Sequence, residues 1–515
     1  MIRSQSTLSR ARTEPSRAWR ATWLLAALLM AGTPHAMDAQ SRTQPARSSR
    51  PAATTPHGAS ELRHDLTSML DGVTRSGSWG AMVVSLTRGD TLLARNAGEM
   101  MLPASTMKLY TAALALHAFG PEYRFSTDVL YDGALDPSGA VNGNLYLRGA
   151  GDPALAARFM PDRRPAAAVD ALARVVRDAG VTHVRGDIYG DASLFEPQRI
   201  PEGWLTRYLH AGYAARVSAL SLNENLVTIA VMPHASDDQA TVRFEPDTRV
   251  IPLTNNVRTV AGRNARVVAL THPDGRVEVR GTIGRNAGVR RYNLVVEEPA
   301  RHATSALLEA LRRAGVQVDG DVELAVTPPD AVRIGGVPSP PLHQLISVMN
   351  RESINHYGEL LFRNAARWEF SDRPGSAETG NAVLKRFMAD EVGADPDAVF
   401  AADGSGLSVL DRITARSLIQ LLHHANNASW SSVFHASLPV AGVSELLRGR
   451  MRNTPAEGNL HGKTGTTNDV VSLGGYVTAE NGEILAFALI YNGTDRWNAR
   501  EAIDLMGATM AGFVR

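Results

Sequence analysis

The sequence predicts an α+β protein of several domains, in which one domain is interrupted by a long β-rich insertion. The 515 residues are too many for one hydrophobic core, so two or three domains are expected. Helical and strand patterns lie at both ends of the chain, and roughly two hundred β-rich residues lie between them. The apolar fraction of 44% and the charged fraction of 20% are typical of a globular protein. A net charge of +1 gives no electrostatic reason to expect nucleic acid as a partner.

The N-terminus has the pattern of an export signal. Arg17 and Arg20 precede an apolar run at residues 21–31, and small residues offer cleavage after Ala36 or Ala39. The run is shorter than the ~20 apolar residues that a membrane-spanning helix needs. We therefore expect a signal peptide at residues 1–39 and an exported, periplasmic product without an integral membrane span; an uncleaved anchor is the alternative. Residues 40–58 are rich in Ser, Pro, Thr and Arg and predict a disordered linker.

Local patterns place the elements in order along the chain. Ser60 is a plausible N-cap for a first helix, and Pro103 opens a second helix. Strands are expected at residues 80–87, 91–94, 124–131, 144–148, 472–478 and 484–491, and helices at 61–70, 103–116, 165–179, 343–349, 355–367 and 500–513. Residues 171–188 and 310–322 echo each other, because both read as helix, Gly, strand, Gly-Asp, strand.

Ser105 and Lys108 form the first motif with a chemical meaning. On a helix, positions i and i+3 share a face, so the lysine amine can reach the serine hydroxyl. A serine needs a base to become a nucleophile, and a lysine kept neutral by burial can act as that base, whereas arginine cannot. The flanking residues are apolar, which favours burial of the lysine. A surface Ser and Lys sharing one helical turn is the alternative.

Ser353-Ile354-Asn355 is a second, weaker motif. A Ser and an Asn two positions apart can offer a hydroxyl that relays protons and an amide that holds a substrate carbonyl. A turn or an N-cap is the ordinary role of such a tripeptide.

The third motif is Lys463-Thr464-Gly465-Thr466. The glycine allows close approach of another segment, the lysine supplies positive charge, and the threonine hydroxyls suit a terminal carboxylate. The backbone N–H groups of Thr466 and Ser105 are candidates for an oxyanion hole. A glycine-rich turn with an exposed lysine is the bland alternative.

The rarity of lysine ties the motifs together. Lys108, Lys385 and Lys463 are the only lysines among 53 basic residues. Two of the three therefore stand where a titratable amine is chemically needed. The chain has no cysteine, which excludes a cysteine nucleophile and thiolate metal sites, and no metal or organic cofactor is required by these motifs.

In these motifs the chain resembles the penicillin-recognising serine enzymes, and among them the class C low-molecular-mass penicillin-binding proteins, which are D-alanyl-D-alanine carboxypeptidases and endopeptidases. The stretches 147–153, 186–195 and 403–408 resemble the same family. The resemblance implies a transpeptidase-like catalytic domain, an antiparallel sheet flanked by helices, at residues 59–125 and 327–515. It also implies a β-rich inserted domain at 126–151 and 241–326, and a third domain nested in it at 152–240.

The resemblance implies an enzyme that cuts peptidoglycan stem peptides through an acyl-serine and is acylated by penicillins. Ile354 stands where most relatives have Asp, and Val409 stands where many have Arg, so the side-chain preference of the pocket stays open. Asp191 is a candidate contact for the amine of a diamino acid, with a turn-forming role as the alternative. The balance of carboxypeptidase and endopeptidase activity and the oligomeric state are also open.

Three other functions fit parts of the sequence. A β-lactamase on the same motifs would need fast deacylation, and the long insertion favours a peptide substrate instead. A non-catalytic wall-binding protein would not need the intact Ser and Lys residues. A Ser-His-Asp hydrolase is permitted by the 15 histidines, but no Gly-x-Ser-x-Gly elbow is present, and packing or surface roles are expected for His356 and His461.

Overall fold

The computed structural model describes residues 52–236 and 238–515. The expected signal peptide, residues 1–39, and linker residues 40–51 lie outside the described residues. Residues 52–58 were expected to be disordered, but they are ordered against the C-terminal residues. Gly58 N–H donates to the Val514 carbonyl at 2.7 Å, and Val514 N–H donates to the Pro56 carbonyl at 3.0 Å. The first helix, α1 (Ala59–Gly72), is capped by Gly58 and not by Ser60.

Both ends of the chain build one antiparallel sheet. Its strand order is β2-β1-β22-β21-β20, with bounds Ser78–Ser85 for β1, Thr91–Arg95 for β2, His461–Thr466 for β20, Val470–Thr478 for β21 and Ile484–Asn492 for β22. β1 pairs with β22 along its whole length, from Ser78 opposite Asn492 to Ser85 opposite Leu485. The two predicted halves of the split domain are thus joined at the centre of the sheet.

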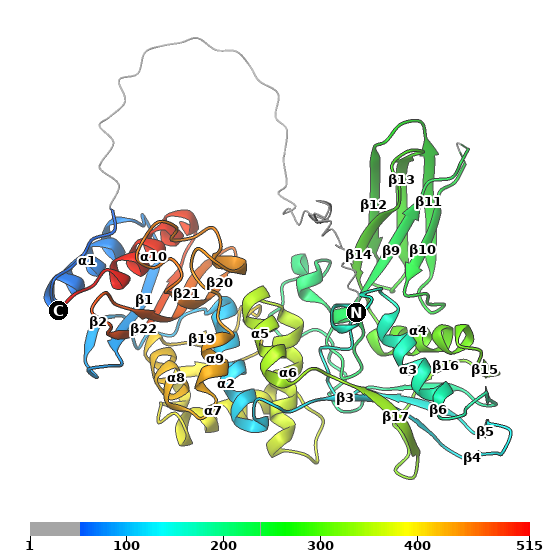
Figure 1. Cartoon of the computed structure of the whole chain (residues 1–515). Helices are drawn as coiled ribbons and strands as arrows, with labels where there is room; N and C mark the ends of the chain where they lie inside the picture. The colour runs from blue at the N-terminus through cyan, green and yellow to red at the C-terminus, as the bar shows by residue number, and fades with distance from the viewer. Residues whose placement is uncertain (1–51, 237) are drawn as a thin grey trace, which may run out of the picture. The chain divides into compact units, whose positions relative to one another are not determined.

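Helices cover both faces of this sheet. Successive side chains of β22 point to opposite faces, and both sets of side chains are apolar, so both faces need to be covered. Leu485, Phe487 and Leu489 pack in a core with α1 and α10 (Arg496–Ala511), whereas Ala486 and Ala488 face a second core with α2 (Met107–Phe119) and α8 (Ala415–Asn427). Figure 1 shows α1 and α10 on one side of the sheet and α2 and α8 on the other. The small alanines let the α2 and α8 layer approach closely.

Further helices lie in the second core. α5 (Leu342–Glu352), α6 (Asn355–Glu369) and α7 (Ala377–Asp390) pack around α2, and the short α9 (Ser431–Ala436) follows α8. The helices predicted at 343–349 and 355–367 are confirmed as α5 and α6. Two short strands, β18 (Val399–Phe400) and β19 (Arg412–Ile413), pair with each other, and a loop connects these two strands.

The insertion begins at β3 (Ser126–Tyr131) and returns at β17 (Val332–Pro338), which pair with each other. They belong to a sheet of order β16-β8-β6-β3-β17, with β6 at Leu145–Arg148, β8 at Ile188–Asp191 and β16 at Val322–Leu324. A smaller sheet has the order β15-β7-β5-β4, with β4 at Ala134–Leu135, β5 at Ala140–Asn142, β7 at His183–Val184 and β15 at Gln317–Val318.

The internal echo in the sequence is confirmed as a structural repeat. α3 (Ala167–Asp178) leads into β7 and β8, and α4 (Pro299–Arg313) leads into β15 and β16. β15 runs parallel to β7, and β16 runs parallel to β8. Gly180 and Gly315 end the two helices with φ values of +86° and +85°, which only glycine adopts without strain.

The sheets and cores of the insertion show how its residues group, whereas the expected domain boundaries stay a prediction. Residues 226–296 form two three-stranded sheets around a core of their own, with bounds Leu226–Met232 for β9, Thr241–Glu245 for β10, Leu253–Val260 for β11, Ala265–Thr271 for β12, Val277–Gly284 for β13 and Arg290–Val295 for β14. Much of the range 152–240 packs in one core with β3, β6 and α4, because α3 buries its apolar face against α4. Phe195 and Trp204 pack in smaller clusters with Leu360 and Leu407, respectively.

Within the described residues, no helix has both the length and the apolarity needed to span a membrane.

Candidate active site

Ser105 lies in a 3₁₀ turn, Ala104–Thr106, that continues directly into α2. The preceding Ala104 has φ +48°, a left-handed conformation that costs a non-glycine residue of order 1 kcal/mol. This backbone turn places the half-buried Ser105 side chain at the N-terminal end of α2. The Lys108 amine, one turn further on, lies 3.1 Å from the Ser105 hydroxyl oxygen.

The Lys108 side chain is fully buried. Its amine donates to the Asn355 side-chain oxygen at 2.6 Å and to the Ser405 carbonyl at 2.5 Å. Burial lowers the pKa of this amine to about 8, although three nearby carboxyl groups oppose the shift. A neutral amine has two N–H donors and one lone pair. With both donors engaged by carbonyl oxygens, the lone pair faces Ser105.

Ser353 lies at the C-terminal end of α5, and Asn355 begins α6. Ser353 has φ +58°, so the chain turns sharply between the two helices. This turn, expected from the tripeptide, aims the Ser353 hydroxyl at Lys463. The Asn355 amide was expected to hold a substrate carbonyl. Its oxygen instead accepts from Lys108, and its nitrogen donates to the Tyr213 carbonyl at 2.9 Å.

Lys463 is the second fully buried lysine. Its amine lies 2.8 Å from the Ser353 hydroxyl oxygen and donates to the Thr464 carbonyl at 2.9 Å. Burial and the charge of Lys108 both lower the pKa of the Lys463 amine well below its usual range. Lys385, in contrast, makes a partly exposed ion pair with Asp397.

Strand β20 is the edge strand next to Ser105. A Cβ added at Gly465 would lie 3.0 Å from the Ser105 nitrogen, so the glycine allows this close approach. Thr467 N–H donates to the Val470 carbonyl in β21. Because N–H groups alternate along an antiparallel strand, the Thr466 N–H points away from β21, toward the side on which Ser105 lies. The two expected oxyanion-hole donors are thus on facing segments.

A second glycine, Gly406, also packs closely against the segment that carries Ser105. Gly406 has φ +83°, and a Cβ there would lie 1.9 Å from the Ala104 carbonyl oxygen. The loop 402–411 therefore touches the segment before the nucleophile and also supplies the Ser405 carbonyl to Lys108. The loop belongs to the Asp-Gly-Ser-Gly-Leu-Ser stretch in the sequence, but its structural role was not predicted.

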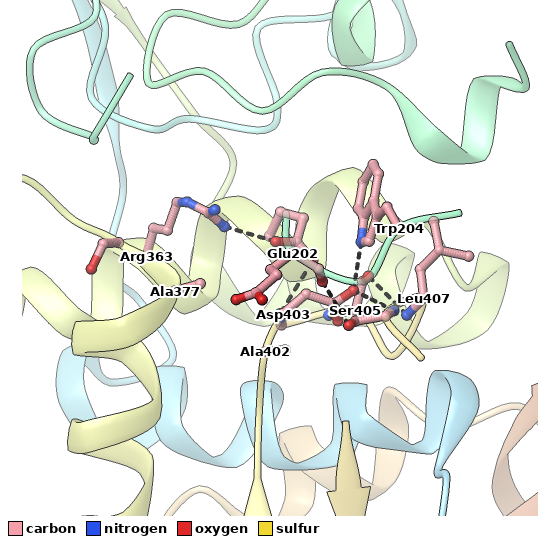
Figure 2. Close-up of polar contacts among 12 residues, drawn as sticks. Glu202, Trp204, Arg363, Ala377, Ala402, Asp403, Ser405 and Leu407 are labelled. Atoms are coloured by element: carbon pink, nitrogen blue, oxygen red, sulfur yellow. Dashed lines mark hydrogen bonds and ion pairs between the residues drawn. The ribbon is translucent and has the colours of Figure 1, made fainter. Parts of the chain in front are cut away.

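Asp403 holds this loop in shape. One carboxylate oxygen accepts from the N–H groups of Ser405 and Gly406, at 2.8 and 2.6 Å. The other accepts from Ser408 N–H and from the Trp204 indole N–H, both at 2.7 Å. Figure 2 shows these contacts, with Trp204 reaching Asp403 from a different segment. Four donors on one buried carboxylate fix both the loop and a residue of the insertion.

Two more buried carboxyl groups lie beside Asp403. Glu359 accepts from Gly404 N–H at 3.1 Å and pairs with the fully buried Arg363 at 2.7 Å; burial, followed by the charge of Asp403, raises its pKa to about 7. Asp411 accepts from Ala402 N–H at 2.8 Å, and burial raises its pKa well above the usual range. These groups favour the protonated form of Lys108 and limit the fall of its pKa.

Two adjoining cavities open at the nucleophile, and Ser105, Ser353 and Thr466 line both. One has a volume of about 340 Å³ and is bordered by Tyr208, Tyr213, Gly406 and Leu407. The other has a volume of about 290 Å³ and is bordered by Thr464 and by side chains of α10. The predicted motif residues therefore converge in one cleft.

Asp191 does not belong to this cleft. It lines a separate cavity, of about 550 Å³, that none of the motif residues borders. Its carboxylate accepts from the N–H groups of Ser193 and Thr327, at 2.9 and 2.8 Å. These contacts match the turn-forming alternative, and the contact of Asp191 with the amine of a diamino acid stays a prediction.

Other sequence-marked residues have structural roles. His356 is buried, contacts the Ser221 hydroxyl at 2.7 Å and has its pKa lowered to about 3 by burial. Ile354 packs against the core around α2, and Val409 is 37% exposed outside both cavities.

Comparison with known proteins agrees with this geometry. The model of the family described as "D-Ala-D-Ala carboxypeptidase 3 (S13)" matches residues 62–512. The chain is 33% identical over 462 residues to the D-alanyl-D-alanine carboxypeptidase of Actinomadura sp. (strain R39), which covers 86% of this chain and 83% of the relative. It is 24% identical over 419 residues to the D-alanyl-D-alanine carboxypeptidase DacB of Haemophilus influenzae, covering 80% of this chain and 85% of the relative.

The fold is shared with solved structures. The crystal structure of penicillin binding protein 4 from Haemophilus influenzae superposes with a TM-score of 0.70 and 23% identity, over 83% of this chain and 93% of that chain. A second structure of that protein, in complex with a β-lactam, superposes with a TM-score of 0.66 and 22% identity. The predicted class of fold, a multidomain penicillin-binding α+β architecture, is confirmed.

Proposed function

Because this chain belongs to the D-Ala-D-Ala carboxypeptidase 3 (S13) family of serine peptidases, we propose that it hydrolyses D-alanyl peptide bonds in the stem peptides of peptidoglycan. The reaction passes through an acyl-enzyme on Ser105. The observation that carries the proposal is the environment of Lys108. Burial lowers the pKa of its amine to about 8, two of its hydrogen bonds end on the carbonyl oxygens of Asn355 and Ser405, and the Ser105 hydroxyl oxygen lies 3.1 Å away.

Acylation begins when Lys108 accepts the hydroxyl proton of Ser105. The Ser105 oxygen attacks the carbonyl carbon of the D-alanyl bond, and negative charge develops on the carbonyl oxygen. The N–H groups of Ser105 and Thr466 stabilise this oxyanion. Arginine in place of Lys108 would keep the charge but lose the base, because a guanidinium stays protonated.

Ser353 relays a proton as the carbon–nitrogen bond breaks: it gives its hydroxyl proton to the nitrogen of the leaving group and receives the proton that Lys108 took from Ser105, so Lys108 becomes neutral again. Lys463, 2.8 Å from the Ser353 oxygen, stabilises the negative charge that builds on it. The hydroxyl groups of Thr464 and Thr466 bind the terminal carboxylate of the substrate. In deacylation a neutral amine beside Ser105 takes one proton from water as the water oxygen attacks the acyl carbon. The ester bond to Ser105 then breaks, the same proton passes to the Ser105 oxygen, and the peptide acid is released.

Penicillins should acylate the same serine, since they present a strained amide and a carboxylate to the same groups. A fold relative binds a β-lactam. Peptidoglycan lies outside the cytoplasmic membrane, so export to the periplasm through the predicted signal peptide at residues 1–39 is part of the proposal.

The test is labelling with fluorescent penicillin. Wild-type protein should form a stable adduct, Ser105→Ala should form none, and Lys108→Arg should react at least about 10³-fold more slowly. The exposed variant Lys385→Arg should label like wild type. Label that persists in Ser105→Ala would defeat the assignment, and rapid multiple turnover of a chromogenic cephalosporin would favour a β-lactamase.

A further inference from the structure

The cavity beside Thr464 and Thr466 is strongly cationic. Three guanidinium groups line it, from Arg450, Arg496 and Arg500, and none of its lining residues is acidic. Asp504, which does not line the cavity, pairs with Arg450 at 2.6 Å, so the cavity lining itself keeps an excess of positive charge. Arg496 donates to the Thr467 carbonyl at 2.9 Å, so it is held next to the end of β20.

The position of two of these arginines is unfavourable for α10 itself. Arg496 and Arg500 stand four residues apart in its first turns, and no acidic residue lies in the first turn. The N-cap residue, Asp495, does not cap the helix with its carboxylate, which accepts from Arg75 N–H and from the Asn498 amide. Cations at a helix N-terminus oppose the helix dipole, and like charges at i and i+4 repel each other. Burial and the charge of Arg450 also lower the pKa of Arg500. An anion held between the arginines would offset all three costs.

Apolar side chains flank the arginines at the mouth of the cavity. Trp497 is 77% exposed and Leu446 is 46% exposed, and both line it. A volume of about 290 Å³ is near the lower end of pockets that hold drug-sized ligands. Because Thr464 and Thr466 bind the terminal carboxylate in the proposed function, this cavity is on the leaving-group side of the reaction.

We propose that Arg450, Arg496, Arg500 and Trp497 form a leaving-group subsite that recognises a second carboxylate, beyond the one bound by the threonines. The substrate class is a D-alanyl peptide whose leaving group is larger than D-alanine and acidic, such as the acceptor strand of a cross-linked peptide. This inference rests on the proposed function and adds a specificity to the same cleft.

A matched pair of substrates tests the subsite on the wild-type protein. Acyl-D-Ala-D-Glu and acyl-D-Ala-D-Gln differ only in the charge of the leaving group. We expect kcat/KM to be at least about tenfold higher for D-Glu, the effect of one charge-assisted hydrogen bond, and the ratio to shrink as salt is raised. A ratio near one, or below one, overturns the subsite.

Substitutions of single arginines then test which side chains cause the preference for D-Glu. Arg500→Gln should lower the D-Glu to D-Gln ratio several-fold. Arg448→Gln removes the same charge from an exposed position outside the cavity, and it should keep the wild-type ratio. Equal losses in the two variants would mean a general electrostatic field and would overturn the subsite.

Failure of the two proposals looks different. If Ser105 labels with penicillin and D-Ala-D-Ala is hydrolysed without any preference for D-Glu, only the subsite fails. If the wild-type protein neither labels nor hydrolyses any of the three peptides, the proposed function itself fails.

Discussion

Acylation of Ser105 should rise about tenfold between pH 7 and pH 9. The pKa of Lys108 is lowered to about 8 by burial, so the amine is neutral in about one tenth of the molecules at pH 7 and in about nine tenths at pH 9. Only the neutral form can accept the Ser105 proton. The rate therefore increases with pH and levels off above the pKa.

The size of the pKa shift determines how much larger the neutral fraction of Lys108 becomes at a given pH. With the ordinary lysine pKa of 10.5, roughly 3 molecules in 10⁴ would hold a neutral amine at pH 7. Burial thus increases the reactive fraction about 300-fold at that pH. Because the neighbouring Lys463 also has a lowered pKa, the midpoint belongs to the coupled pair of amines.

The assay is the second-order rate of fluorescent penicillin labelling from pH 6 to pH 10 at constant ionic strength. The wild-type curve should have a midpoint near pH 8, and Lys108→Arg should lack the rising limb at every pH. A rate that stays flat from pH 6.5 to pH 9, or a midpoint above pH 10, would refute the role of a buried neutral lysine.

Three further substitutions test the support of the site. Asp403→Asn can keep at most two of the four hydrogen bonds, so it should lower the free energy of unfolding, measured by urea titration, by about 3 kcal/mol or more. A loss below about 1 kcal/mol would contradict the role of Asp403 in holding the loop 402–411. Gly465→Ala should slow labelling at least about 100-fold while circular dichroism stays native, and normal labelling would contradict the close approach to Ser105. Phe487→Ala should lower unfolding free energy by about 3–5 kcal/mol without moving the pH midpoint of labelling; a moved midpoint would contradict a purely structural role.

The motif residues could be predicted because their chemistry leaves few alternatives. Lysine is rare in this chain, so its presence at 108 and 463 was informative, and both side chains are fully buried in the cleft. The hairpin of β21 and β22 and the helices α5 and α6 followed from their local patterns.

Other features depend on contacts that a sequence does not display. Asp403 looks like an ordinary turn residue until Trp204, from the insertion, is placed against it. The Asn355 amide is engaged by Lys108 and by the Tyr213 carbonyl, a partner that no local pattern indicates. α7, α8 and α9 were not predicted, and no local pattern indicates that Asp191 accepts from the N–H group of Thr327.

The grouping of the strands in the insertion could not be predicted for a related reason. Both 152–240 and 226–296 contain short strands and turns, so composition does not separate them. The boundary is set by which core each strand enters, and the pairing of α3 with α4 decides this at long range.

The pairing of β1 with β22 has a consequence for how the molecule is made. During synthesis from the N-terminus, the segment that carries the nucleophile appears first, and its central sheet partner appears near the very end. An unfinished chain cannot assemble the sheet, since such distant contacts form late and slowly. The cleft at Ser105 therefore needs residues 461–492, which carry Lys463 and the partner strand of β1, before it can form.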